Sequence, residues 1–138
     1  MTKTGTAPIT TDAARQVAAL RGALRTFLRT SEQIARENGL TPQRHLLLLM
    51  IKGAPDGSGS ATVTDLAERM ELAQSTVTEL VKRAEDAGLL ERERSVADGR
   101  IAHLSLSREG ERRLAAAFRA HHGERRRLQR MLAELDGN

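Results

Sequence analysis

Residues 64–106 constrain the fold most, because they combine two short helical patterns with a charged hairpin pattern. The first helical pattern is TDLAERM, and after the break ELAQ a second one follows in STVTELVKRAEDAGLL. This is the spacing of a helix-turn-helix. The next residues, ERERSVADGRIAHLSL, place an Asp-Gly turn between two candidate strands. The chain is therefore expected to fold around a helix pair with a β-hairpin attached to it.

Each helix of the pair has one apolar face that can pack on a core. Thr62 or Thr64 can supply the N-cap of the first helix. The core face of the first helix is formed by Val63, Leu66, Ala67 and Met70. The core face of the second helix is formed by an i, i+3, i+4, i+7 stripe of Val77, Leu80, Val81 and Ala84.

The outward face of the second helix combines short polar side chains with basic ones, as a helix in a DNA major groove does. Gln74 can pair with adenine, the hydroxyls can meet base edges or phosphates, and the basic pair can hold the backbone. The predicted contacts on this helix are Gln74, Ser75, Thr76, Thr78, Lys82 and Arg83. Glu79 and Asp86 share this face and would repel phosphate, so an ordinary solvated helix surface is the alternative.

The hairpin adds arginines on a projecting loop. Gly88 ends the preceding helix, and strands are predicted over 89–94 and 101–106. Arg100 follows the Asp-Gly turn and suits the negative potential of a narrow minor groove. Asp98 can hold that guanidinium, or a strand arginine such as Arg94, through bidentate pairing. Good turn chemistry explains Asp98-Gly99 as well, and both explanations can be true together.

The whole chain divides into a lead, two long helices and a lobe between them. We expect a disordered lead over 1–11, an N-terminal dimerisation helix over 12–40, a DNA-binding lobe over 41–106 and a C-terminal dimerisation helix over 107–138. Within the lobe, Thr41-Pro42 opens a helix that runs through LLLLMI to Lys52. That helix is apolar nearly all round, which predicts the buried centre of the fold.

The dimer is expected because the two long helices have apolar faces that the small lobe cannot cover alone. In the last helix, residues at alternating spacings of four and three form a seam for a partner helix. They are Leu114, Phe118, His121, Arg125, Leu128, Leu132 and Leu135. The seam is interrupted by His121 and Arg125 and is loosened near Gly123. A single amphipathic helix that packs on the first helix of its own subunit is the alternative.

Composition limits the partners. The net charge of +4 and the pI near 10.6 indicate a polyanion such as double-stranded DNA, and an aromatic content of 1% disfavours binding by base stacking. The absence of cysteine removes disulfides and thiolate metal sites. No apolar run approaches the roughly 20 residues of a membrane span, and the polar N-terminus lacks the apolar centre of a secretory signal. We therefore expect a cytoplasmic protein without a membrane partner.

In the order and spacing of its helical and hairpin motifs, the chain resembles the multiple-antibiotic-resistance regulator (MarR) family of winged-helix transcription factors. The resemblance runs from about Thr41 through Leu114, and LAERMELAQSTVTELVKRAEDAGLL followed by Asp98-x-Arg100 is its strongest part. It implies a mainly α (α+β) fold, a winged helix-turn-helix with long N- and C-terminal dimerisation helices. It also implies a homodimeric repressor of a pseudo-palindromic operator. By this similarity the recognition helix begins near Ser75, Arg100 enters the minor groove and Asp98 orients it.

The resemblance also implies that a phenolic or other aromatic acid binds between the dimer helices and the DNA-binding lobe. The candidate ligand residues are Arg25, Arg29, Arg44 and His45. The two arginines of the first helix can meet a carboxylate, although a solvated or phosphate-facing stripe explains them too. One departure is expected: the family pattern has a further helix after the long fifth one, which we predict to be missing here.

Enzyme motifs are absent from the sequence: there is no nucleophile elbow, HExxH, P-loop or Rossmann fingerprint. We therefore expect neither catalysis nor a cofactor. We also expect no metal site, because the adjacent His121 and His122 project about 100° apart on a helix. The predicted function is a DNA-binding transcriptional regulator. The alternative is a winged-helix protein-interaction module without sequence-specific DNA binding.

Overall fold

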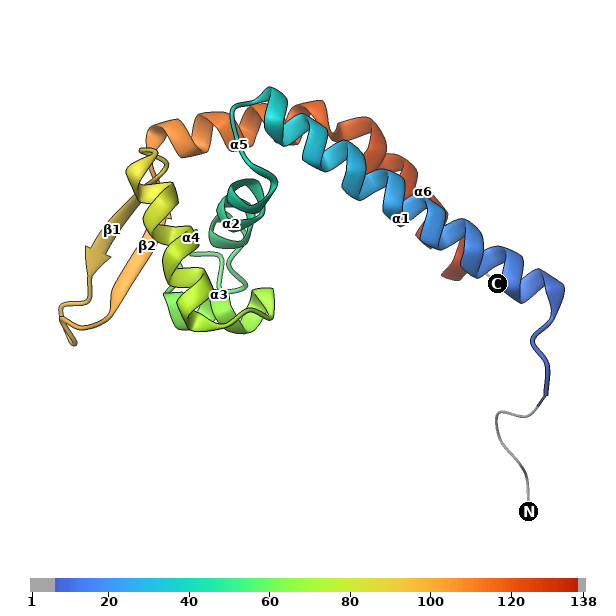
Figure 1. Ribbon diagram of the computed structural model, residues 1–138, viewed down its shortest axis with the longest axis horizontal. Helices are drawn as coiled ribbons and strands as arrows, with labels where there is room; N and C mark the ends of the chain where they lie inside the picture. Colours follow the sequence, from blue (N-terminus) through green and yellow to red (C-terminus); the bar gives the residue numbers. More distant parts are fainter. Residues whose placement is uncertain (1–6, 137–138) are drawn as a thin grey trace, which may run out of the picture.

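The computed structural model describes residues 7–136, which form six helices and one two-stranded antiparallel sheet. The elements are α1 (Thr11–Glu37), α2 (Pro42–Lys52), α3 (Val63–Met70), α4 (Gln74–Asp86), β1 (Leu90–Arg94), β2 (Ala102–Leu106), α5 (Arg108–Ala120) and α6 (His122–Asp136). Figure 1 shows α1 and α6 side by side as a long arm that leaves a lobe made of α2, α3, α4 and the hairpin. The predicted mainly α fold with a small β-hairpin is confirmed. The predicted disordered lead lies mostly outside the described residues.

Hydroxyl side chains begin the helices where the sequence predicts them. The Thr41 hydroxyl accepts a hydrogen bond from the Arg44 backbone N–H at 3.1 Å, with proline as the first residue of α2. Thr62, rather than Thr64, caps α3, and it forms a reciprocal capping box with Asp65. Each cap satisfies backbone donors that a helix N-terminus leaves free, which fixes where these elements start.

The helices α1 and α4 end through left-handed glycines that reverse the chain. Gly39 and Gly88 have φ of +74° and +76°, which a glycine adopts without steric cost. After Gly88, the Leu89 N–H donates to the Ala84 carbonyl at 3.0 Å and turns the chain into the hairpin. In the α3–α4 turn the left-handed position is occupied by Glu71, with φ of 56°. Glu71 therefore adopts an unfavourable backbone conformation in this tight connection.

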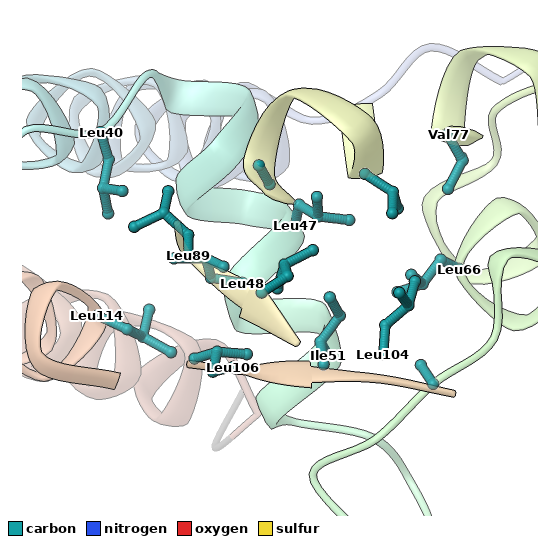
Figure 2. Close-up of a cluster of buried hydrophobic side chains, with 14 of the residues drawn as sticks. Leu40, Leu47, Leu48, Ile51, Leu66, Val77, Leu89, Leu104, Leu106 and Leu114 are labelled. Atoms are coloured by element: carbon teal, nitrogen blue, oxygen red, sulfur yellow. The ribbon is translucent and has the colours of Figure 1, made fainter. Parts of the chain in front are cut away.

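The core of the lobe is aliphatic and centres on one face of α2. Leu47, Leu48 and Ile51 are fully buried and meet Leu66 of α3 and Leu104 of β2, as Figure 2 shows. The predicted core faces of α3 and α4 are confirmed. The remaining members of the buried cluster are Ala35, Leu40, Ala61, Ala67, Val77, Val81, Ala84, Leu89, Leu90, Leu106 and Leu114, with others at its edge.

The expectation that α2 is buried all round is wrong. Leu46 and Leu49 are 45% and 43% exposed, on the side of α2 that turns away from the core. The lobe is too small to supply packing partners for both sides of the helix. An apolar surface is therefore left between α2 and the arm.

The hairpin pairs in a regular antiparallel register. Leu90 lies opposite Leu106, and Arg94 lies opposite Ala102. Ala61, which precedes α3, forms a bridge to Leu104 through hydrogen bonds of 3.0 and 2.8 Å. This bridge joins the hairpin to the loop before α3, so that the sheet is part of the lobe.

The prediction of one unbroken final helix is wrong, as is the prediction that a further helix after the fifth is missing. α5 ends at Ala120, His121 is its C-cap, and α6 begins at His122. Gly123 has a low helix propensity and lies just after the break. The apolar spacing continues through His121, so spacing alone suggested a single helix.

Several contacts hold the first part of α5 against the lobe. Arg113 donates to the Gly39 carbonyl at 2.8 Å and to the Glu109 carboxylate at 2.7 Å. Hydrogen bonds from Arg112 and Arg113 lower the pKa of Glu109 to about 2. Gly110 lies directly against the Leu89 backbone carbonyl, where a Cβ atom would overlap it.

None of the helices within residues 7–136 is both long enough and apolar enough to span a membrane.

Two glycine-to-alanine substitutions test the close contact of α5 with the lobe, which Gly110 makes with the Leu89 carbonyl. Gly110→Ala should lower the free energy of unfolding by about 1–3 kcal/mol, because the new methyl group displaces a backbone carbonyl. Gly123→Ala should raise it by about 0.5–1 kcal/mol, since the space there is open and alanine favours a helix. Urea denaturation at a fixed protein concentration measures both. Equal effects of the two substitutions would contradict the close approach at Gly110.

Candidate nucleic-acid interface and adjacent cavity

The outward face of α4 is open to solvent along its length. All six residues predicted to contact DNA on this helix are exposed: Gln74, Ser75, Thr76, Thr78, Lys82 and Arg83. The N-cap residue Ala73 offers no side-chain acceptor. The first backbone N–H groups of α4 are thus available to a phosphate, which a helix N-terminus favours.

Two of these side chains already have intramolecular partners. The Gln74 amide donates to the Thr64 hydroxyl at 3.1 Å, which links the beginnings of α3 and α4. Arg83 contacts Glu79 one turn earlier at 3.2 Å, with both side chains largely exposed. Exposed pairs of this kind are weak and are readily exchanged for a phosphate. Of the two acidic residues on this face, Glu79 is thus paired with Arg83 in the free protein, and Asp86 has no ion-pair partner among the described residues.

The hairpin carries its arginines at and beside the tip. Arg100 is the most exposed of them, with 92% of its side chain accessible. One Asp98 oxygen accepts from the Arg100 backbone N–H at 3.0 Å and from its Nε at 3.3 Å. Asp98 therefore contacts the predicted arginine, but through a single oxygen and without the expected bidentate pairing. Arg94 instead donates to the Gly99 carbonyl at 2.7 Å, which supports the turn from within.

A further ion pair fixes α4 relative to the hairpin. Arg92 of β1 meets both carboxylate oxygens of Glu85 in α4, at 2.6 and 3.2 Å. This two-point contact restrains the angle between the helix and the strand. The sequence alone gives no partner for Arg92, because the pair depends on how the turn at Gly88 folds back.

A cavity of about 380 Å³ lies between the arm and the lobe, in the range of small-molecule sites. Its apolar wall comes from α1, α2 and α5 and includes Phe27, Leu28, Leu46, Leu49, Leu114, Ala117 and Phe118. Its polar wall includes Ser31, Glu32, Gln43, His45, His121 and Arg125. The exposed side of α2 thus forms part of a binding-sized hollow.

One of the four predicted ligand residues, His45, lines this cavity. Arg25, Arg29 and Arg44 are not part of its wall, and their role in ligand binding stays a prediction. The α1 wall begins at Phe27 and continues one turn later at Ser31 and Glu32. The cation in the wall is Arg125 of α6, which the sequence showed only as an interruption of the apolar seam.

Burial lowers the pKa of both histidines of the cavity. His121 is 6% exposed, its ring lies 4.5 Å from that of Phe27, and its Nε2 has no hydrogen-bond partner among the described residues. Burial lowers the pKa of His121; the Phe27 backbone opposes this effect and the Arg125 cation adds to it. Burial also lowers the pKa of His45, and the nearby His121 adds to that shift.

A helix pair with an exposed second helix, followed by a β-hairpin wing, defines a winged helix-turn-helix protein. Residues 38–101 match the family model described as MarR family. This match confirms the resemblance to the MarR family that is seen in the sequence.

Known proteins resemble this chain over different lengths. The HTH-type transcriptional repressor MdtR of Bacillus subtilis (strain 168) is 36% identical over 75 residues, which cover 54% of this chain and 46% of that protein. The match thus spans about half the length of this curated relative.

Similar structures extend over nearly the whole chain. AbsC, a MarR family transcriptional regulator from Streptomyces coelicolor, has a TM-score of 0.73 at 21% identity, covering 96% of this chain and 92% of its own. Transcriptional regulator Tm0710 from Thermotoga maritima has a TM-score of 0.65 at 26% identity, covering 87% and 90%. The arm and the lobe together therefore follow the fold of these proteins.

A double-mutant cycle tests the Glu85–Arg92 ion pair, which joins α4 to the wing (residues 90–106). Glu85→Gln and Arg92→Gln should show a coupling free energy of roughly 0.5–1 kcal/mol in urea denaturation, because the pair is forked and partly shielded. The same cycle at Glu79 and Arg83 is the control, and about 0.3–0.5 kcal/mol is expected there. A coupling no larger than the control would show that the forked pair does not restrain the wing.

Proposed function

We propose that this chain is a homodimeric transcriptional repressor that binds a pseudo-palindromic DNA operator and is released by a small aromatic or phenolic acid. The observation that carries the proposal is the combination of an exposed polar α4 with the exposed Arg100 of the wing, tied together by Glu85 and Arg92. The B. subtilis relative is named as a repressor, and structures of AbfR, a protein of similar fold, contain bound DNA.

In the proposed complex α4 enters the major groove from its N-terminal end. Its hydroxyl and amide side chains suit base edges and phosphates, while Lys82 and Arg83 lie farther along the helix and suit the backbone. Gln74 would exchange its bond to Thr64 for a base or would use its free carbonyl oxygen. Sequence reading is therefore assigned to the first turns of α4.

The wing supplies the second contact. Arg100 projects from the tip with its guanidinium in solvent, as a side chain that enters the adjacent minor groove requires. Asp98 accepts from the backbone N–H and from the Nε of Arg100 and leaves the two terminal guanidinium nitrogens to DNA. Arg94 supports the tip and is placed to meet a flanking phosphate.

Exposed apolar side chains on the arm support the dimer. Val17, Leu24 and Leu28 of α1 are 56%, 39% and 59% exposed, and Leu132 of α6 is 43% exposed. Burying such residues in a second copy removes apolar surface from water. A two-fold arrangement would place the two α4 helices about 34 Å apart, one turn of the duplex.

The cavity supports the effector part of the proposal. It is mainly apolar and lies where the arm meets the lobe, with Arg125 as a cation for an acid group. In a protein of similar fold, BpsR of Bordetella bronchiseptica, DNA binding is regulated by 6-hydroxynicotinic acid. A flat acid of this size fits the cavity volume.

Substitutions at the two DNA elements test the interface. Arg100→Ala should weaken operator binding by about 1–3 kcal/mol at matched salt, because a groove contact is lost in each half-site. Lys82→Ala should weaken binding to all duplexes alike and make the salt dependence less steep by about one unit per lost phosphate contact. Arg126→Ala in α6 is the control and should change neither. An operator is first selected from random duplexes, and affinity is measured by fluorescence anisotropy.

Two outcomes would oppose the proposal. Unchanged operator affinity in Arg100→Ala would remove the wing from DNA recognition. Failure of the parent protein to bind any duplex at low salt would favour the protein-interaction module instead.

An acidic substitution on the arm tests the dimer. Leu132→Glu should convert dimers into monomers, because it places a charge in an interface that must lose water. Gln129→Glu, an exposed position three residues earlier with the same charge change, should leave the dimer intact. Sedimentation equilibrium measures both, and a dimeric Leu132→Glu variant would exclude this face of α6 from the interface.

A further inference from the structure

The junction between α5 and α6 connects two differently attached parts of the molecule. α5 is held against the lobe by Arg113 and by the close contact of Gly110 with Leu89. α6 packs along α1 in the arm, as Figure 1 shows. His121 is the C-cap of α5 and lies directly before α6. A change at this residue would therefore alter how the arm leaves the lobe.

Arg125 connects the two sides of this junction. From α6 its Nη1 donates to the Phe118 carbonyl of α5 at 2.5 Å. Its guanidinium carbon also lies 3.6 Å from the centre of the Phe118 ring. The Phe118 carbonyl is one of the last four of α5, which lack partners within a regular helix. Arg125 thus supplies an end-cap and a cation–π contact with one side chain.

The same guanidinium faces the cavity. The wall beside it is mainly apolar, and its other polar groups are the imidazoles of His45 and His121, the carboxyl group of Glu32 and uncharged side chains. An anionic head group in the cavity would therefore find its cation in Arg125. His121, whose buried Nε2 has no hydrogen-bond partner among the described residues, also lines the cavity.

We propose that Arg125 is a ligand-controlled clasp: the carboxylate of a flat apolar acid in the cavity takes its guanidinium from the Phe118 carbonyl and thereby loosens the α5–α6 junction. This inference rests on the proposed effector site and assigns its regulation. A carboxylate accepts two charge-assisted hydrogen bonds from arginine, whereas the carbonyl accepts one. Once the acid is bound, its carboxylate is therefore the favoured partner of Arg125. The α5–α6 junction then loses the hydrogen bond to the Phe118 carbonyl.

A binding experiment tests the ligand half of the inference. The probe is 2-naphthoate, and 2-naphthamide is its neutral counterpart of the same shape. The chain contains neither Trp nor Tyr, so naphthyl fluorescence is read without interference from those residues. Naphthoate should bind the parent protein and an Arg126→Gln control equally. Replacing the acid by the amide, or Arg125 by Gln, should weaken binding by about tenfold or more.

A distance measurement tests the junction. The chain has no cysteine, so Arg108→Cys and Arg130→Cys place spin labels on exposed sites of α5 and α6 alone. Double electron–electron resonance is recorded on labelled protein diluted with unlabelled protein. Naphthoate should shift or broaden the distance distribution, whereas naphthamide should not. Arg125→Gln in the labelled protein should show the altered distribution without ligand, and Arg126→Gln should not.

The binding experiment and the distance experiment contain no DNA. Their outcomes therefore test this inference independently of the DNA binding in the proposed function. Absence of saturable naphthoate binding, equal binding of the amide, or an unchanged distance distribution in the naphthoate complex would each overturn the clasp. If the distances respond but the protein binds no duplex, the clasp is supported and the proposed function fails. If naphthoate releases DNA while the distances remain fixed, effector control is supported and the clasp is wrong.

Discussion

The structure depends most on the buried face of α2. Leu47, Leu48 and Ile51 form the surface on which α1, α3, α4, α5 and β2 all pack. Full burial of each such side chain is worth roughly 1.5–3 kcal/mol, and replacing one by alanine leaves a cavity that the neighbours cannot fill. The position of α4 and of the hairpin therefore follows from this one aliphatic surface.

The same helix has a second face with a different environment. Leu46 and Leu49 lie half-exposed in the cavity, on the side opposite the core. A ligand there would touch the helix that supports α4, while its acid group would meet Arg125 of the arm. The cavity is thus placed where it can influence both the lobe and the arm, and the proximity of these elements requires no long chain of contacts.

The sequence predicted the parts of the fold that local rules determine. Thr41, Thr62 and Gly88 mark helix ends through hydrogen bonds and φ angles that involve only near neighbours. The core faces of α3 and α4 follow from helical periodicity. The cavity could not be predicted in this way, because it brings together side chains from α1, α2, α5 and α6 that are far apart in the chain. Arg125 appeared only as a polar residue in an apolar seam, and that interruption was the signal that marked it.

The course of α1 limits what a change at the α5–α6 junction can do. Ile34 and Ala35, near the end of this 27-residue helix, are buried against the lobe, while its earlier residues pair with α6. Because α1 is continuous, a looser junction cannot detach the arm from the lobe. It can only let α6 move along or around α1, which changes the apolar surface that the arm presents to a second copy. In the proposed dimer, such a movement would change the separation of the two α4 helices, and a duplex with fixed half-site spacing binds well only at one separation.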